Sequence, residues 1–214
     1  VTHHGKYYDF NGLQIPQTPF QKPHPPIALS ALSPNSSSMR LAAKRDWDPI
    51  SANFIGAWSV ASHWNVYSDE CHLHGRVATN ARWRVARSIF VAESNDEAER
   101  FVMDPDGSFM HYYEYLFDIF ERSKLKPAFV ANIGDDPNDL SPRRMVDSFV
   151  IRGDVQAVTR QLLDFHDQVG GFGTLLMTAH DWLDKTRMRR SMELMATEVV
   201  PSLNKVLRAS TTTD

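Results

Sequence analysis

The sequence has almost no cysteine, no excess of positive charge and no long apolar run. Cys71 is the only cysteine among 214 residues, which excludes a disulfide framework and makes a reducing, cytoplasmic setting the expectation. The net charge of −3 offers no basic face to nucleic acid. No apolar run approaches the roughly 20 residues that span a bilayer, and the first residues lack a signal-peptide pattern. A globular protein with neither nucleic acid nor a membrane as partner is therefore predicted.

Patterns typical of metal and dinucleotide sites are also lacking. His72 and His74 lie two residues apart and would splay on a helix, and no Gly-x-Gly-x-x-Gly motif occurs. We predict no metal site.

The first 26 residues begin without methionine and are rich in proline. Five of the twelve prolines lie between residues 16 and 26, where they exclude a helix or a central strand. An extended loop is therefore expected over residues 1–26. Two explanations stay open: a disordered or trimmed terminus, or a chain that starts in the middle of a longer protein.

Further along, apolar strand patterns alternate with helical spacing. Short apolar runs predict strands at residues 27–32, 49–53, 85–92 and 174–179. Helical spacing and caps predict helices at residues 39–43, 57–71, from 95, 109–120, 155–169 and 188–199, the last ending near Pro201. Residues 124–152 are predicted to be a loop excursion. This order indicates parallel βαβ units, either as a small open α/β sheet or as half of a closed barrel.

Five short motifs then occur in an informative order. They are QKPHPPI at residues 21–27, Ser33-Pro34 followed by Ala42-Ala43, DPDGSF at 104–109 with Tyr112-Tyr113, GTLLM at 173–177 with AHDW at 179–182, and RSMEL at 190–194. Together they resemble the bacterial-luciferase-like monooxygenases that use reduced FMN. The resemblance covers residues 5 to 205.

The resemblance implies a fold, a reaction and partners. The fold is a (β/α)8 TIM barrel of which this chain, as one domain over residues 1–214, supplies strands five to eight; the N-terminal half would precede Val1. A separate flavin reductase delivers reduced FMN, and one oxygen atom of O2 enters a small apolar organic substrate. A homodimer or heterodimer is expected. Two alternatives stay open: an F420-dependent oxidoreductase of the same fold, and a shortened flavin-binding subunit without catalysis.

The first candidate site is the serine-rich segment at residues 33–38, which we call the serine loop. It follows a predicted strand and opens a helix, so free N–H groups and the helix dipole suit a phosphate, although a plain N-cap loop has the same composition. The resemblance makes Ser33, Asn35, Ser36 and Ser38 candidates for binding FMN. Asn35 stands where the family often has glutamate, and Asp46 stands where it often has glycine.

The second candidate site lies at the ends of later strands. His180 follows the last strand, where barrel enzymes place active-site residues, and could hydrogen-bond the flavin or act as acid or base. A histidine that only fixes the turn is the alternative. Trp182 could wall the substrate pocket or pack against the terminal helix, and Asn53 could reach flavin or substrate or simply cap a loop.

Two arginines and an aromatic stripe complete the expectations. Arg84 and Arg87 lie in one strand, so we expect one of them to pair with an acid from the other half of the barrel and the other to face solvent. The stripe from Phe109 to Phe120 predicts core or a dimer contact; the family resemblance implies that nearby residues can line the mouth of the substrate pocket.

Overall fold

Five parallel strands form the centre of the protein, as a computed structural model of residues 1–14, 17–180 and 183–211 describes it. They are β3 (Ala28–Ala31), β4 (Asp48–Ser51), β5 (Arg84–Val91), β6 (Val150–Gly153) and β7 (Thr174–Thr178). The order is β3-β4-β5-β6, and β7 also pairs with β5. The four predicted strands are thus confirmed, and β6 is an additional one.

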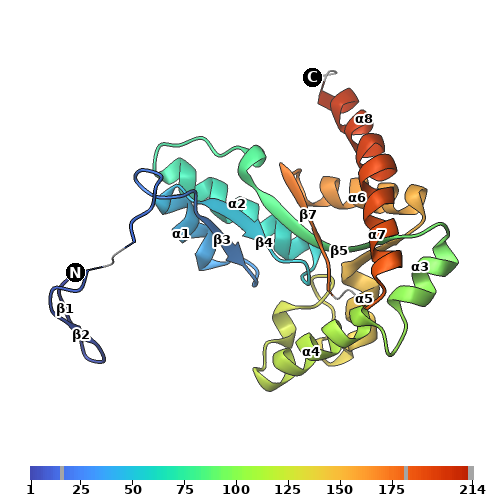
Figure 1. Cartoon of the computed structure of the whole chain (residues 1–214), viewed down its shortest axis with the longest axis horizontal. Helices are drawn as coiled ribbons and strands as arrows, with labels where there is room; N and C mark the ends of the chain where they lie inside the picture. The colour runs from blue at the N-terminus through green and yellow to red at the C-terminus, as the bar shows by residue number, and fades with distance from the viewer. Residues whose placement is uncertain (15–16, 181–182, 212–214) are drawn as a thin grey trace.

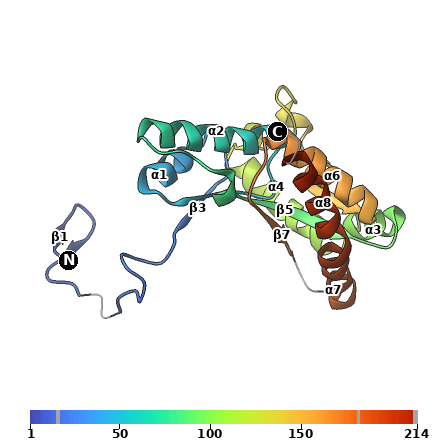
Figure 2. The same ribbon diagram turned by 90° about the horizontal axis from the view of Figure 1, so that it is seen from above.

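The helices follow the strands along the chain and pack beside them (Figure 1). They are α1 (Ser37–Arg45), α2 (Ala57–Leu73), α3 (Asn95–Val102), α4 (Ser108–Arg122), α5 (Pro142–Phe149), α6 (Val155–Val169), α7 (Lys185–Leu194) and α8 (Val200–Thr211). Figures 1 and 2 show α1 and α2 beside β3 and β4, and α6, α7 and α8 together at the other end. Within the described residues no helix is both long and apolar enough to cross a membrane.

An arm precedes the first strand of the sheet. Its described residues carry one small antiparallel hairpin, β1 (His3–His4) with β2 (Asp9–Phe10), and are exposed throughout. In both views the arm stands clear of the rest of the molecule (Figures 1 and 2).

The segment predicted as a loop excursion contains more structure than expected. Two 3-10 turns, Lys126–Ala128 and Pro137–Asp139, are followed by α5 and then directly by β6. Pro142 opens α5 at a position where its missing N–H costs nothing, and Ser141 caps it by accepting from the Arg144 amide at 3.3 Å. A loop was predicted here, whereas Pro142 starts a helix.

The terminal helix continues past Pro201, contrary to the prediction. A π-helical turn, Met195–Val199, separates α7 from α8, and Pro201 lies at the start of α8. Proline lacks an N–H and clashes with the preceding turn of a regular helix. The wider turn just before it relieves that conflict, so the chain stays helical to Thr211.

One face of the sheet is covered by helices and the other is open at its outer strands. Leu29 of β3 packs against the apolar side chains of α1 and α2. Leu175 of β7 packs against those of α6 and α7. Their neighbours Ser30 and Leu176, which alternate to the opposite face, are exposed. The register partners Ser30↔Ile50 and Ile50↔Arg84 share this second face, which we call the open face.

Arg84 is paired on the open face by an acid of this same chain. Its Nη1 lies 2.6 Å from Asp48 Oδ2, and Arg82 Nε lies 2.7 Å from Asp48 Oδ1. The expectation of an acid from the other half of the barrel is therefore wrong, because the neighbouring strand supplies it. Asp46 closes α1 in the left-handed conformation (φ 56°), so this turn forms without the glycine.

Candidate functional site

A buried serine in the middle of β5 is the centre of the candidate site. Ser88 is fully buried, and a buried hydroxyl is costly unless it is hydrogen-bonded. Three side chains bond its Oγ: Asn53 Nδ2 at 2.9 Å, His180 Nε2 at 2.8 Å and Tyr113 OH at 3.1 Å. Tyr112 extends the network by donating to Asn53 Oδ1 at 3.4 Å. We call these five residues the Ser88 cluster.

The fold brings the Ser88 cluster together from distant parts of the chain. Asn53 follows β4 and His180 follows β7, so both lie at the carboxyl ends of parallel strands that flank β5. Tyr112 and Tyr113 reach the cluster from α4. Active sites of parallel α/β folds form at this edge of the sheet.

Aromatic rings enclose His180. Its ring centroid lies 4.1 Å from that of Tyr112 and 4.9 Å from that of Phe109, the latter in an edge-on arrangement. Burial lowers the pKa of His180 to about 4, so the imidazole is neutral near neutral pH. Ser88 has no exposed surface whereas His180 and Tyr112 keep some, so these two residues open the cluster to a ligand.

Both tyrosines remain protonated. Burial raises the pKa of Tyr113, an effect only partly offset by its hydrogen-bond contact with Ser88, and burial likewise raises the pKa of Tyr112. Neutral hydroxyl, amide and imidazole groups therefore make up the whole cluster. Such a set can orient an oxygen-bearing ligand by hydrogen bonds without adding net charge.

Arg87 supports the cluster from the covered side of the sheet. Its side chain is buried, lies 4.0 Å from the Phe165 ring centroid and donates to the carbonyl oxygens of Ala52, Asn53 and Ile55 at 3.5, 3.3 and 3.1 Å. Burial lowers its pKa to about 10, so it remains a cation at neutral pH. The sequence left open which of the two arginines faces solvent, and the structure exposes part of Arg84 and buries Arg87. Arg87 fixes the backbone that carries Asn53.

The serine loop lies at the end of β3 and is anchored by α2. Ser36 is the N-cap of α1, with its Oγ accepting from the Ser38 amide at 3.3 Å. The backbone N–H of Asn35 donates to Ser62 Oγ at 2.9 Å, and Asn35 adopts a left-handed backbone conformation (φ 52°). No acidic residue lies in the first turn of α1, so nothing there repels an anion.

A chain of hydrogen bonds runs from the core to the serine loop. Trp83 Nε1 donates to Ser51 Oγ at 3.0 Å, and Ser51 Oγ lies 3.0 Å from His63 Nδ1. His63 Nε2 lies 2.9 Å from the Ser33 carbonyl oxygen, which can only accept. Burial lowers the pKa of His63, although the bond to Ser33 opposes this effect. Neutral His63 is therefore protonated at Nε2 and accepts from Ser51 at Nδ1.

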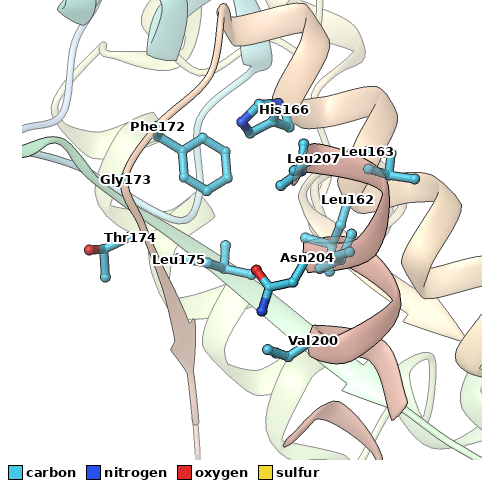
Figure 3. A pocket seen from close by; sticks show the side chains of 11 residues that line it. Leu162, Leu163, His166, Phe172, Gly173, Thr174, Leu175, Val200, Asn204 and Leu207 are labelled. Carbon is cyan, nitrogen blue, oxygen red and sulfur yellow. The ribbon is translucent and has the colours of Figure 1, made fainter. Parts of the chain in front are cut away.

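An apolar pocket of about 320 Å³ lies elsewhere, between α6, α8 and the beginning of β7 (Figure 3). Phe172 and Leu175 line it together with Leu162, Val200 and Leu207. None of the predicted site residues that the structure describes lines it. It lies at the opposite end of β7 from His180. Among residues 1–14, 17–180 and 183–211, no group of three or more side chains is arranged to hold a metal ion.

The chain has clear relatives among known proteins. No protein-family model matches it. It is 34% identical over 181 residues to 3,6-diketocamphane 1,6-monooxygenase of Pseudomonas putida, a match that covers 84% of this chain and 47% of the relative. It is 26% identical over 152 residues to limonene 1,2-monooxygenase of Rhodococcus erythropolis, covering 71% and 36%. The chain thus spans about half the length of the first of these relatives and a third of the second.

Solved structures agree with the sequence comparison. The oxygenating constituent of 3,6-diketocamphane monooxygenase from the CAM plasmid of Pseudomonas putida, a type II Baeyer-Villiger monooxygenase in complex with FMN, matches with a TM-score of 0.76 and 30% identity. That match covers 95% of this chain and 58% of the other. The chain is homologous to the luciferase-like FMN-dependent monooxygenases. An F420-dependent secondary alcohol dehydrogenase has the same fold at 12% identity and a TM-score of 0.58, covering 95% and 56%.

Homology to the luciferase-like enzymes confirms the predicted family and TIM-barrel fold class. Which strands of the barrel the chain supplies stays a prediction. Of the predicted site residues, the structure joins Asn53 and His180 through Ser88, and it places Ser33, Asn35, Ser36 and Ser38 together in the serine loop. Trp182 lies outside the described residues.

Several residues of the site were not predicted from the sequence. Ser88 lies within an apolar strand, and Tyr112 and Tyr113 were part of the aromatic stripe assigned to core or a dimer contact. One signal was present for Ser88: a serine directly before the apolar residues Ile89, Phe90 and Val91 of the same strand. The sequence contains no such signal for His63, because the residues around it in the helix form no distinctive pattern.

Proposed function

We propose that this chain supplies part of the flavin and substrate site of a reduced-FMN-dependent monooxygenase. A separate reductase delivers the reduced FMN, and one oxygen atom of O2 enters a small apolar organic substrate. The main support is the Ser88 cluster: a neutral, partly exposed histidine held at the strand ends of a chain homologous to such enzymes.

The serine loop fits the phosphate of FMN. Ser33, Asn35 and Ser37 are exposed, α1 begins there, and no carboxylate lies in its first turn. Ser36 acts mainly through its cap, whereas Ser33, Asn35 and Ser38 provide further polar groups. When bound, reduced FMN supplies the electrons that activate O2.

The Ser88 cluster orients the reacting groups and keeps water away. His180 and Asn53 contribute hydrogen bonds, and Phe109 and Tyr112 enclose the imidazole with apolar surface. A small apolar substrate with one polar atom suits these surroundings. Trp182 follows His180 closely in sequence and is retained as a candidate wall of the substrate pocket.

The open face and the outer edges of β3 and β7 are expected to pack against a further part of the barrel. Strands β3 and β7 each pair with one neighbour among the described strands, and Ser30 and Leu176 are exposed beside those edges. Four further strands, those of the N-terminal half of a luciferase-like barrel, close the sheet and complete the site. We place the protein in the cytoplasm, as a homodimer or heterodimer.

Anaerobic titration of the full-length protein tests the cofactor. Reduced FMN is expected to bind, and turnover with O2 is expected to oxygenate a diketocamphane or limonene probe. Tight binding of reduced F420 with no affinity for FMN would overturn the proposal in favour of an F420-dependent oxidoreductase, whose fold is shared. Binding of FMN with no oxygenation of any probe would favour a non-catalytic flavin-binding subunit.

A further inference from the structure

The hydroxyl of Ser88 can make three hydrogen bonds, and three partners surround it. A serine hydroxyl has one proton to donate and two lone pairs that accept. Asn53, Tyr113 and His180 all lie within 3.1 Å of its Oγ. Two of the three must therefore donate to Ser88, and the third must accept from it.

Asn53 is the first donor. Its Nδ2 faces Ser88, and its Oδ1 faces the Tyr112 hydroxyl, which donates to it. In this orientation of the amide an N–H group occupies the first lone pair of Ser88 Oγ.

Tyr113 is the second donor. Its side chain is fully buried, and Ser88 Oγ is the one acceptor that its hydroxyl meets within the described part of the chain. If Tyr113 accepted instead, its own proton would be buried without a partner, which is unfavourable. The second lone pair of Ser88 is thereby occupied as well.

Only His180 is left to accept the Ser88 proton. Its Nε2 lies 2.8 Å from Ser88 Oγ and must present a lone pair there. The ring is neutral because it is buried, so its single N–H has to be at Nδ1.

We propose that Ser88 is a positioning residue that fixes His180 in the Nδ1–H tautomer. His180 then offers a hydrogen-bond donor at Nδ1, while Ser88 occupies the lone pair with which Nε2 could take a proton. Within the proposed function, His180 donates a hydrogen bond to an oxygen atom of the flavin or substrate and does not act as a base through Nε2. The inference deepens the role of that site and rests on the proposed function only for the identity of the ligand.

Nitrogen-15 NMR of histidine-labelled full-length protein tests the tautomer directly. The signals of His180 among the nine histidines are assigned from their loss in His180→Gln. The expected result is a protonated Nδ1 and a bare Nε2. A protonated Nε2 in the unsubstituted protein would overturn the proposal.

Three serine variants separate positioning from general packing. Ser88→Ala is expected to remove the preference for the Nδ1–H tautomer. The nitrogen-15 chemical shifts of the two ring nitrogens of His180 should then move towards each other. Ser88→Thr keeps a hydroxyl and should retain the Nδ1–H form. Ser59→Ala is the matched control, because Ser59 is equally buried and its hydroxyl has no hydrogen-bond partner among the residues that the structure describes. An unchanged His180 spectrum in Ser88→Ala would contradict the proposal.

The measurement is independent of cofactor chemistry, since it needs no flavin. A protein that has the Nδ1–H tautomer but does not bind reduced FMN would refute the proposed function and leave this inference intact. In an active protein, Ser88→Ala is expected to lower kcat at least tenfold with little change in the affinity for reduced FMN, and Ser88→Thr is expected to restore much of the rate.

Discussion

His63 Nε2 donates a hydrogen bond to the carbonyl oxygen of Ser33 at 2.9 Å, across 30 residues of sequence. This bond links α2 to the serine loop. The adjacent Ser62 accepts a hydrogen bond from the backbone N–H of Asn35. Two consecutive residues of one helix thus fix the backbone that we assign to the FMN phosphate. The loop is therefore shaped in advance of binding, which reduces the entropy lost when a ligand binds.

Substitution of His63 should weaken binding of the phosphate selectively. His63→Asn can still reach Ser51 but is too short to reach Ser33, so affinity for reduced FMN is expected to fall by roughly tenfold, the value of about one hydrogen bond. His63→Gln, whose amide extends further, should lose less. Reduced riboflavin, which lacks the phosphate, should bind all variants alike.

The control for this experiment is His72→Gln, an exposed position on the same helix. Equal losses for FMN and riboflavin in His63→Asn would show that the substitution disturbs the whole site rather than the serine loop. Thermal unfolding of each variant checks that α2 remains folded.

Replacing His180 should slow the reaction more than it weakens cofactor binding. His180→Gln is expected to reduce kcat by about 100-fold, as for loss of a positioned hydrogen-bond donor, with little change in reduced-FMN affinity. The measurement is substrate oxygenation at saturating reduced FMN. His111→Gln, exposed on α4, is the matched control. A kcat equal to that of this control would remove His180 from the reaction.

Stability should fall as the pH drops towards 4, and His180 should account for part of this change. Burial lowers its folded-state pKa from 6.5 to about 4, so the unfolded chain takes up a proton first as the pH falls. The resulting loss reaches about 3 kcal/mol between pH 7 and pH 4, and it is absent above pH 7. Urea unfolding at several pH values should show a shallower slope for His180→Gln. His63 contributes in the same direction and remains in both proteins.

Removal of the Arg87 guanidinium should destabilise the protein. Arg87→Met leaves three buried carbonyl oxygens without their donor, which is expected to lower the free energy of unfolding by roughly 2–4 kcal/mol. Arg87→Lys should lose less, since it keeps a cation but not the fork of donors. Arg122→Met, exposed at the end of α4, is the control in urea unfolding. Equal midpoints for Arg87→Met and Arg122→Met would show that the carbonyl contacts contribute nothing.

Local patterns were sufficient to predict most of the fold. Apolar runs marked β3, β4, β5 and β7, and the Ser36 and Asp154 caps marked the starts of α1 and α6. The four-residue β6 was too short to stand out, and the predicted loop over residues 124–152 missed α5, which Pro142 begins. Whether a proline ends or starts a helix depends on which residue caps it, and Ser141 supplies that cap.

The candidate site was predictable only in part. His180 and Asn53 could be selected because each follows a strand, and strand ends are where ligands bind in parallel α/β folds. Their connection through Ser88 could not, because it depends on which face of β5 each residue occupies and on how α4 packs across it. The partners of Arg87 could not be predicted either, since they are backbone carbonyl oxygens, which every sequence contains.

The contacts of Ser88 also determine when the site can form during synthesis. Asn53 lies 35 residues before it, Tyr113 25 residues after it and His180 92 residues after it. Contacts so distant in sequence form slowly, because long loops must close first. The ribosome must release β7 before His180 can meet Ser88, so the hydrogen bonds of Ser88 are incomplete until then. Formation of the His180–Ser88 bond in a nascent chain would consequently report that β7 had docked on β5.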